Sequence, residues 1–230
     1  LYIGALLPLV ALVVIWLLIP AHKPVIQDKP PKVSPFQTGL PLYLFAGLAT
    51  MFSIVTLQVV GGFYFQDQLA LTTKETARML SLGLLLTGVG MIVTQGVQMK
   101  KPKWQPKPLI LTGSVLLISS MALFLFVINL IGFYVAFFLF GIGTGLMMPG
   151  FMAGASLAVA REQQGGVAGL VASVQGISAV IAPILSTSLY QLDKHLPFVV
   201  VTVLVLVMTL FLVKSRSEMN KNRIIDADSK

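Results

Sequence analysis

Seven long apolar segments constrain this chain more than any other feature. A helix needs roughly 20 apolar residues to cross a bilayer, and seven segments of about that length alternate with polar loops. They are residues 1–19, 40–65, 76–98, 108–128, 131–158, 166–189 and 197–213. The last has only two threonines among its apolar residues, so it lacks the polar stripe of a helix in water. The sequence therefore predicts an all-α, polytopic membrane protein with about seven transmembrane helices.

The composition supports lipid as the solvent of these helices. Charged residues make up 10% of the 230 residues and hydrophobic residues 56%, whereas soluble domains carry about 25% charged residues. The net charge of +8 does not indicate a nucleic-acid partner, because the basic residues lie between apolar segments rather than on one soluble face. The chain has no cysteine, which excludes disulfides and thiol chemistry.

Basic residues are distributed unequally between alternate loops. With the first segment starting outside, thirteen of the sixteen Lys and Arg residues fall on one side, in the loops 20–39, 99–107 and 159–165 and in the C-terminal tail. Lys74, Arg78 and Lys194 fall on the other side, where Asp67 is expected in an outer loop. The positive-inside rule then predicts a multi-pass protein of the cytoplasmic or inner membrane with a cytoplasmic C-terminus.

The loop 20–39 divides the chain into unequal parts. It contains five prolines and three lysines, which is typical of an extended linker. We expect residues 1–19 to be the last helix of an N-terminal half, 20–39 the central linker, 40–213 a C-terminal six-helix half and 214–230 a cytoplasmic tail. Because Leu1 opens directly into an apolar segment, we also expect the chain to be a fragment of a larger protein.

Glycine and proline gather in the fifth and sixth segments. Glycines four residues apart let helix backbones approach closely, and a proline inside a helix removes a hydrogen bond and bends it. These residues predict tight helix packing, with or without a hinge. They are Gly141, Gly145, Pro149, Gly150 and Gly154 in the fifth segment, and Gly176 and Pro183 in the sixth.

A few polar and methionine residues at membrane depth are candidates for a substrate cavity. Met51 and Gln58 share one helix face, and a buried glutamine amide needs a partner or a wet cavity. Methionine adapts to ligands of varied shape. The candidates are Met51, Gln58, Phe137, Phe140, Met147, Met148 and Gln175. The alternative interpretation is ordinary helix packing, with Gln58 and Gln175 bonded across helices.

The predicted spans lack the groups that catalysis needs. No Asp, Glu, His or Lys lies at mid-depth, and both histidines lie in loops without metal-ligand spacing. We therefore expect no catalytic residue, no metal site, no cofactor and no enzyme. Thr72 and Glu75 have the spacing of a capping box at the start of the third segment.

Three stretches resemble a known family of membrane proteins. They are Gly62 to Asp67, Thr94 to Lys101 with Pro108 to Gly113, and Gly141 to Gly169 with Gly176 to Pro183. Together they resemble the C-terminal half of a major facilitator superfamily transporter of the drug:proton antiporter type, plus the helix before its central loop. This resemblance implies a six-helix bundle of two inverted three-helix repeats, here 40–128 and 131–213, with a substrate cavity near Gln58, Gly83 to Gly90, Gly141 to Met148 and Gln175.

The resemblance implies part of a secondary transporter. The leading hypothesis is proton-coupled efflux of drugs or other small amphipathic molecules by alternating access, with protons as coupling ion and a missing N-terminal half as partner. The alternative is a non-transporting membrane module that pairs with a separate half or partner protein.

Overall fold

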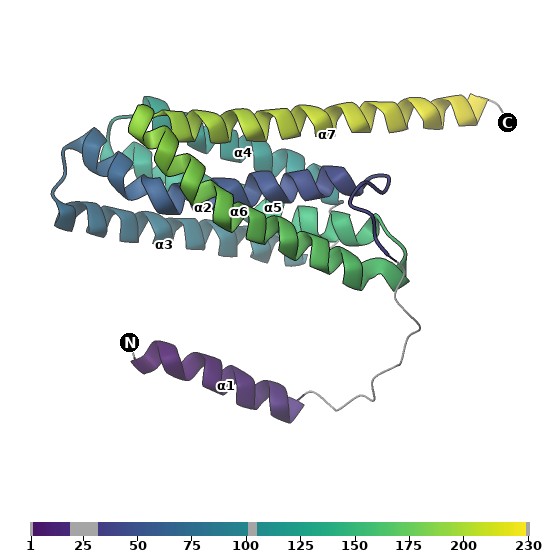
Figure 1. The fold of residues 1–230 in the computed structure, drawn as a ribbon, viewed down its shortest axis with the longest axis horizontal. Helices are drawn as coiled ribbons and strands as arrows, with labels where there is room; N and C mark the ends of the chain where they lie inside the picture. Colours follow the sequence, from purple (N-terminus) through teal and green to yellow (C-terminus); the bar gives the residue numbers. More distant parts are fainter. Residues whose placement is uncertain (1, 19–31, 101–104, 229–230) are drawn as a thin grey trace. The chain divides into compact units, whose positions relative to one another are not determined.

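A computed structural model of the chain describes residues 2–18, 32–100 and 105–228, and it describes the side chains of residues 8, 10, 12–18, 32–100 and 105–215. The described part is helical and contains no strand. It consists of α1 (Tyr2–Leu18), α2 (Leu40–Leu69), α3 (Thr73–Lys100), α4 (Pro106–Phe126), α5 (Leu130–Leu157), the short 3-10 helix η1 (Arg161–Gln163), α6 (Gln164–Leu192) and α7 (Leu196–Asp228) (Figure 1). The chain divides into two units at residue 30, so α1 forms one unit and α2 to α7 the other.

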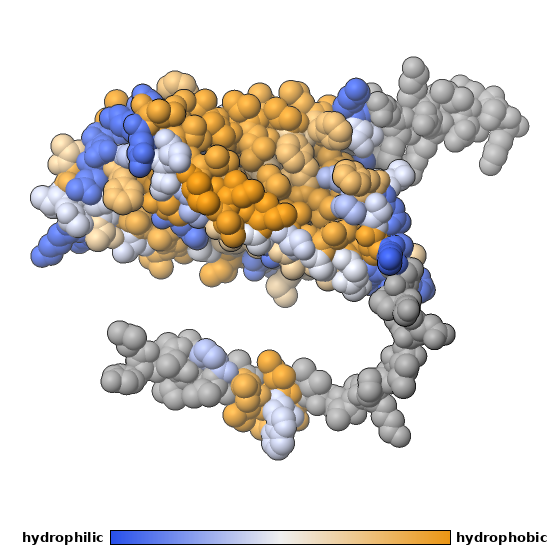
Figure 2. Space-filling model, viewed as in Figure 1, coloured by the Kyte–Doolittle hydropathy of each residue, from blue (hydrophilic) through white to orange (hydrophobic). Residues whose placement is uncertain are grey.

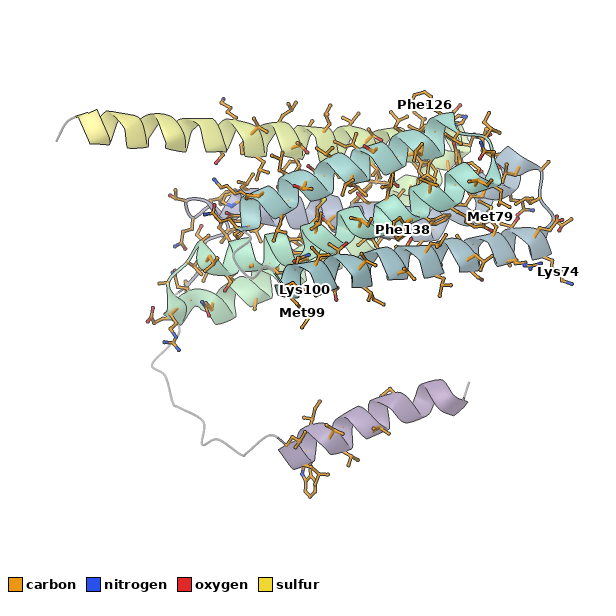
Figure 3. All side chains as sticks on the ribbon, turned by 180° about the vertical axis from the view of Figure 1, so that it is seen from behind. Lys74, Met79, Met99, Lys100, Phe126 and Phe138 are labelled. Carbon is orange, nitrogen blue, oxygen red and sulfur yellow. The ribbon has the colours of Figure 1, made fainter. Side chains whose placement is uncertain are left out.

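Helices α2 to α7 are each long and apolar enough to cross a membrane. Their apolar side chains cover the middle of the bundle surface, and hydrophilic residues gather at its two ends (Figure 2). Lys74 and Lys100 mark the opposite ends of α3 (Figure 3). The all-helical membrane fold predicted from the sequence is confirmed. Helix α1 has 17 residues in the described part, and its role as a span stays a prediction.

The packing of the six helices repeats after three helices. Helix α2 packs against α6, α7 and α5, whereas α5 packs against α3, α4 and α2. Exchanging α2 with α5, α3 with α6 and α4 with α7 therefore maps these contacts onto one another. Short loops join successive helices, which run in opposite directions (Figure 1), so α2 and α5 point opposite ways. This arrangement is that of two inverted three-helix repeats.

Helix α5 is held by glycines that let its neighbours approach. A Cβ atom added to Gly141 would lie 2.1 Å from the Thr87 carbonyl oxygen on α3, and one added to Gly143 would lie 2.9 Å from the Gly113 carbonyl oxygen on α4. Gly145 faces the backbone of α3 in the same way, Gly150 faces side chains of α4, and Gly154 faces the Tyr43 ring on α2. Gly141, Gly145, Gly150 and Gly154 thus lie at helix contacts, and their packing or hinge role stays a prediction.

Side-chain hydrogen bonds to carbonyl oxygens of α5 reinforce this packing. Thr87 Oγ1 donates to the Phe137 carbonyl oxygen at 3.0 Å, and Gln98 Nε2 donates to the Gly145 carbonyl oxygen at 3.2 Å. Ser120 Oγ on α4 donates to the Ala136 carbonyl oxygen at 2.8 Å. These bonds cross between helices in a medium that offers no water, so α3 and α4 are fixed to α5 in rotation as well as distance.

Three details at helix ends test the sequence predictions. The capping box forms: the Thr72 amide donates to Glu75 Oε2 at 2.9 Å, and the Glu75 amide donates to Thr72 Oγ1 at 3.4 Å. The expected outer-loop position of Asp67 is wrong, because α2 continues to Leu69. Helix α7 also continues past the apolar segment to Asp228, so the expected tail 214–230 is largely helical in the described residues. In both places polar residues extend a helix that hydropathy ends too early.

Candidate functional site

A cavity of about 310 Å³ lies between α2, α3 and α5. Each helix presents one face to it, with residues at the three- and four-residue spacings of a helix side. The lining consists of Met51, Ile54, Leu57 and Gln58 from α2, Leu84, Thr87 and Met91 from α3, and Phe140, Thr144 and Met148 from α5. Four of the seven predicted cavity residues, Met51, Gln58, Phe140 and Met148, therefore lie together.

The lining is apolar, adaptable and without charge. Three of its ten residues are methionines and none is ionisable. The hydroxyls of Thr87 and Thr144 use their hydrogen atoms on backbone carbonyls, Thr144 on the Phe140 oxygen at 2.8 Å. Gln58 is exposed and makes no hydrogen bond with the described residues. Its amide therefore offers both donor and acceptor groups to a molecule in this cavity.

Two of the other candidates lie in the packed core. Phe137 and Met147 are fully buried. The Phe137 ring packs on Gly83 and lies 5.2 Å from the rings of Phe65 and Phe124. Met147 packs against Gly113 on α4. Neither side chain lines the cavity, because α5 has neighbours on three sides and only the side with Phe140, Thr144 and Met148 faces it.

Gln175 lies in a different place from Gln58. It lines a second cavity, of about 460 Å³, between α5 and α6, together with residues such as Met152, Ser156 and Val171. Gly176, its neighbour, has no atom within 4 Å of an added Cβ, so the predicted packing role of Gly176 has no contact to support it in the described bundle. Pro149 and Pro183 are half-buried inside continuous helices, and their hinge role stays a prediction.

A hydrogen-bond network closes the bundle end that holds Asp67. Tyr64, fully buried, donates to the Phe124 carbonyl oxygen at 2.9 Å and accepts from Gln68 Nε2 at 3.0 Å. The Tyr64 hydroxyl also lies 3.1 Å from His195 Nδ1, and the tautomer of the His195 ring decides which of the two atoms donates. Lys194 donates to Gln68 at 3.0 Å. This network ties α2 and α4 to the turn before α7.

The acidic side chain at this end is also bonded. Asp67, in the last turn of α2, accepts a hydrogen bond from the Tyr190 hydroxyl on α6. Among the described residues no three His, Cys, Asp or Glu side chains lie close enough to hold a metal ion. The polar groups of this end therefore join helices, and they lie apart from the cavity around Gln58.

The α3 side of the cavity was not predicted residue by residue. Leu84, Thr87 and Met91 have the spacing of three and four residues that Met51, Ile54 and Gln58 have on α2. This spacing, with a methionine at one end, could have indicated the cavity side of α3. It did not do so by hydropathy alone, because α3 has apolar residues on every face.

Comparisons with known proteins bear on this bundle. The model of the Major Facilitator Superfamily matches residues 1–183 and 103–228. Among solved structures, the chain is similar to the crystal structure of the POT family transporter PepTSo, with a TM-score of 0.64 and 17% sequence identity. The match covers 81% of this chain and 38% of that one, so the chain spans less than half the length of that transporter. No curated protein matches. At this identity the likeness concerns the fold alone.

Proposed function

The chain belongs to the Major Facilitator Superfamily, and from this we propose that it forms the C-terminal half of a secondary transporter that exports drugs or other small amphipathic molecules in exchange for protons. Family membership confirms the resemblance to the superfamily that was noted in the sequence, and with it the expectation of a transporter-type protein rather than an enzyme. The share of PepTSo that the chain covers, 38%, supports the view that a second six-helix half completes the carrier.

The proposed substrate class rests on one observation, which is the lining of the cavity between α2, α3 and α5. Three methionines and several aliphatic residues adapt to apolar molecules of different shape. Gln58 adds one amide without charge, which suits a substrate with a hydrogen-bonding group at one end. A cavity wall of this kind favours amphipathic molecules over sugars, peptides or anions, which need several polar or charged partners.

Proton coupling is proposed to depend on residues outside this cavity. A coupled carrier needs a carboxyl or imidazole group at membrane depth, and none of the ten lining residues is ionisable. The coupling acids would then be supplied by the other half. In the complete protein, residues 1–19 would be the last helix of that half and residues 20–39 the linker, with the basic loops and the C-terminus in the cytoplasm.

The test uses the complete carrier in proteoliposomes with an imposed pH gradient. We expect export of amphipathic dyes that stops when a protonophore collapses the gradient. Gln58→Leu should slow transport of dyes that carry a hydrogen-bonding group by about tenfold, the effect of losing one hydrogen bond of about 1.4 kcal/mol. It should leave purely apolar dyes nearly unaffected.

The matched control is Thr112→Val, which removes a polar group from an exposed face of α4 outside the cavity. This variant should transport both dye classes at the rate of the unmodified carrier. Equal losses in the two variants, or transport by the isolated 230-residue chain, would contradict the proposal.

A further inference from the structure

Three methionines line the cavity between α2, α3 and α5, one from each helix. They are Met51 on α2, Met91 on α3 and Met148 on α5. All three are half-buried, and their side chains border the open space of the cavity. The methionines of the packed core are buried instead, and they are Met79, Met121, Met147 and Met208. The cavity therefore gathers thioether groups from three separate helices.

The contact between α2 and α5 places Met51 and Met148 at the same level of the bundle. A Cβ added to Gly47 on α2 would lie 3.0 Å from the Phe151 ring on α5. Met51 follows Gly47 by four residues on α2. Met148 precedes Phe151 by three residues on α5. Because α2 and α5 run in opposite directions, both steps lead the same way along the bundle, by about one helical turn.

The contact between α3 and α5 brings Met91 close to this level. A Cβ added to Gly145 on α5 would lie 3.0 Å from the Met91 Cα atom on α3. Met148 follows Gly145 by three residues, so Met91 and Met148 lie within about one helical turn of each other along the bundle. A methionine side chain is unbranched, with three rotatable bonds, and it adapts to irregular space. The three sulfur atoms can therefore converge on one ligand inside the cavity.

The chemistry of the cavity excludes most metal ions. Zinc and nickel need imidazole or thiolate ligands, and calcium and magnesium need carboxylate oxygens. None of the ten described lining residues is His, Cys, Asp or Glu. An uncharged, apolar lining also leaves the desolvation of a hard cation uncompensated. Thioether sulfur is a soft ligand that selects soft ions such as Cu(I).

We propose that Met51, Met91 and Met148 form a thioether site for a soft monovalent metal ion, of the class of Cu(I) and Ag(I). The absence of a metal site predicted from the sequence was based on histidine ligands, whereas thioethers bind a different class of ion. All three ligands belong to this chain. The site shares its cavity with the proposed export function but does not rest on that function, because ion binding needs neither the other half nor a proton gradient.

The experiment is isothermal titration calorimetry of the purified, tag-free 230-residue chain in detergent, with Ag(I) added in a chloride-free buffer. We expect one Ag(I) ion to bind per chain and Zn(II) not to bind. Met51→Leu, Met91→Leu and Met148→Leu should each weaken Ag(I) binding at least tenfold, since even the residues around metal ligands contribute about 10–100-fold. Leucine replaces methionine at nearly constant volume, so these variants should keep the fold.

The matched control is Met99→Leu on the same helix as Met91. Met99 is exposed beside Lys100 at the end of α3, outside the cavity (Figure 3). This variant should bind Ag(I) as tightly as the unmodified chain. Met147→Leu is a second control, because Met147 is adjacent to Met148 but packs against Gly113. It should also leave binding unchanged.

X-ray absorption spectroscopy of the unmodified chain loaded with Ag(I) is the second measurement, and it needs no variant. We expect sulfur atoms as the nearest neighbours of the ion. Oxygen or nitrogen neighbours in their place would overturn the proposal. The same holds for no binding of Ag(I), for Zn(II) binding as tight as that of Ag(I), and for a loss in Met99→Leu equal to that in Met91→Leu.

Discussion

Helices α5 and α6 have similar glycine contents and opposite surroundings. In α5, the glycines at 141, 143, 145, 150 and 154 all meet another helix, and a Cβ added to any of them would lie 3.0 Å or less from a neighbouring atom. In α6, Gly165, Gly169 and Gly176 have no atom within 4 Å of an added Cβ. The sequence predicts close packing for both helices, but in α6 only Gly166, which faces Val33, makes such a close approach within the described bundle.

The difference shows what a glycine pattern specifies in a membrane helix. A glycine allows the backbone of a second helix to approach closely. A glycine that faces lipid chains adds no such stabilising contact. Helix α3 has both kinds: Gly83 and Gly90 pack on α5, whereas Gly88 and Gly96 are open. Helix α4 has one glycine, Gly113, which packs on α5, and α7 has none. The open faces of α3 and α6 are therefore the surfaces that we propose to contact the other half of the carrier.

The largest expected effect comes from replacing a glycine by alanine in α5, compared with the same replacement in α6. Gly141→Ala would force a Cβ against the Thr87 carbonyl oxygen, which is backbone that cannot move aside. Overpacking of this kind costs about 1–3 kcal/mol or more, so the helical circular dichroism of the purified chain should melt at a clearly lower temperature. Gly176→Ala is the matched control and should leave the melting temperature unchanged or higher. Similar losses in both variants would remove the contrast between α5 and α6.

A smaller effect is expected from hydrogen bonds that cross between helices. Thr87→Val keeps the shape of the side chain and removes the bond to the Phe137 carbonyl oxygen on α5. Bonds of this kind contribute about 0.6 kcal/mol, and at most about 1.7, so denaturation in mixed micelles should shift by that amount. Thr187→Val on α6 removes bonds that stay within its own helix. If Thr187→Val destabilises the chain as much as Thr87→Val, the cross-helix bond has no special role.

The smallest effect is expected at Gln175. Its side chain is half-buried beside the second cavity and makes no hydrogen bond with the described residues. Gln175→Leu should therefore change the free energy of unfolding of the isolated chain by less than about 0.5 kcal/mol. The same denaturation experiment measures it. A loss above about 1 kcal/mol would show that the Gln175 side chain has a partner which the described residues do not indicate.

The fold could be predicted from the sequence because hydropathy alone sets the number of spans and the loops alternate in charge. The face of α2 with Met51 and Gln58 could also be predicted, since Gln58 is a polar residue that marks one side. In α5 the polar residue Thr144 lies four residues from Phe140 and from Met148 and marks the same side. That signal was not used, so Phe140 and Met148, which line the cavity, were not separated from Phe137 and Met147, which pack in the core.

Other features depend on how helices are rotated against one another. Gln58 and Gln175 have the same amide side chain, yet they line different cavities, because α2, α3 and α5 border the one and α5 and α6 border the other. The network around Tyr64 joins residues 60 and 131 positions apart, and no local pattern relates them. The end of α2 was also predicted too early, because hydropathy falls near Asp67 whereas the helix continues to Leu69.

The most direct test of the account is photo-crosslinking from α6 in the complete carrier. A photoreactive phenylalanine analogue replaces Val180, which is exposed and lies one turn from Gly176 on the same helix face. The control position is Val115, exposed on α4. We predict that mass spectrometry finds position 180 linked to peptides of the other half and position 115 linked to lipid. Lipid adducts alone at both positions would contradict the claim that this bundle is one half of a two-half carrier joined through α6.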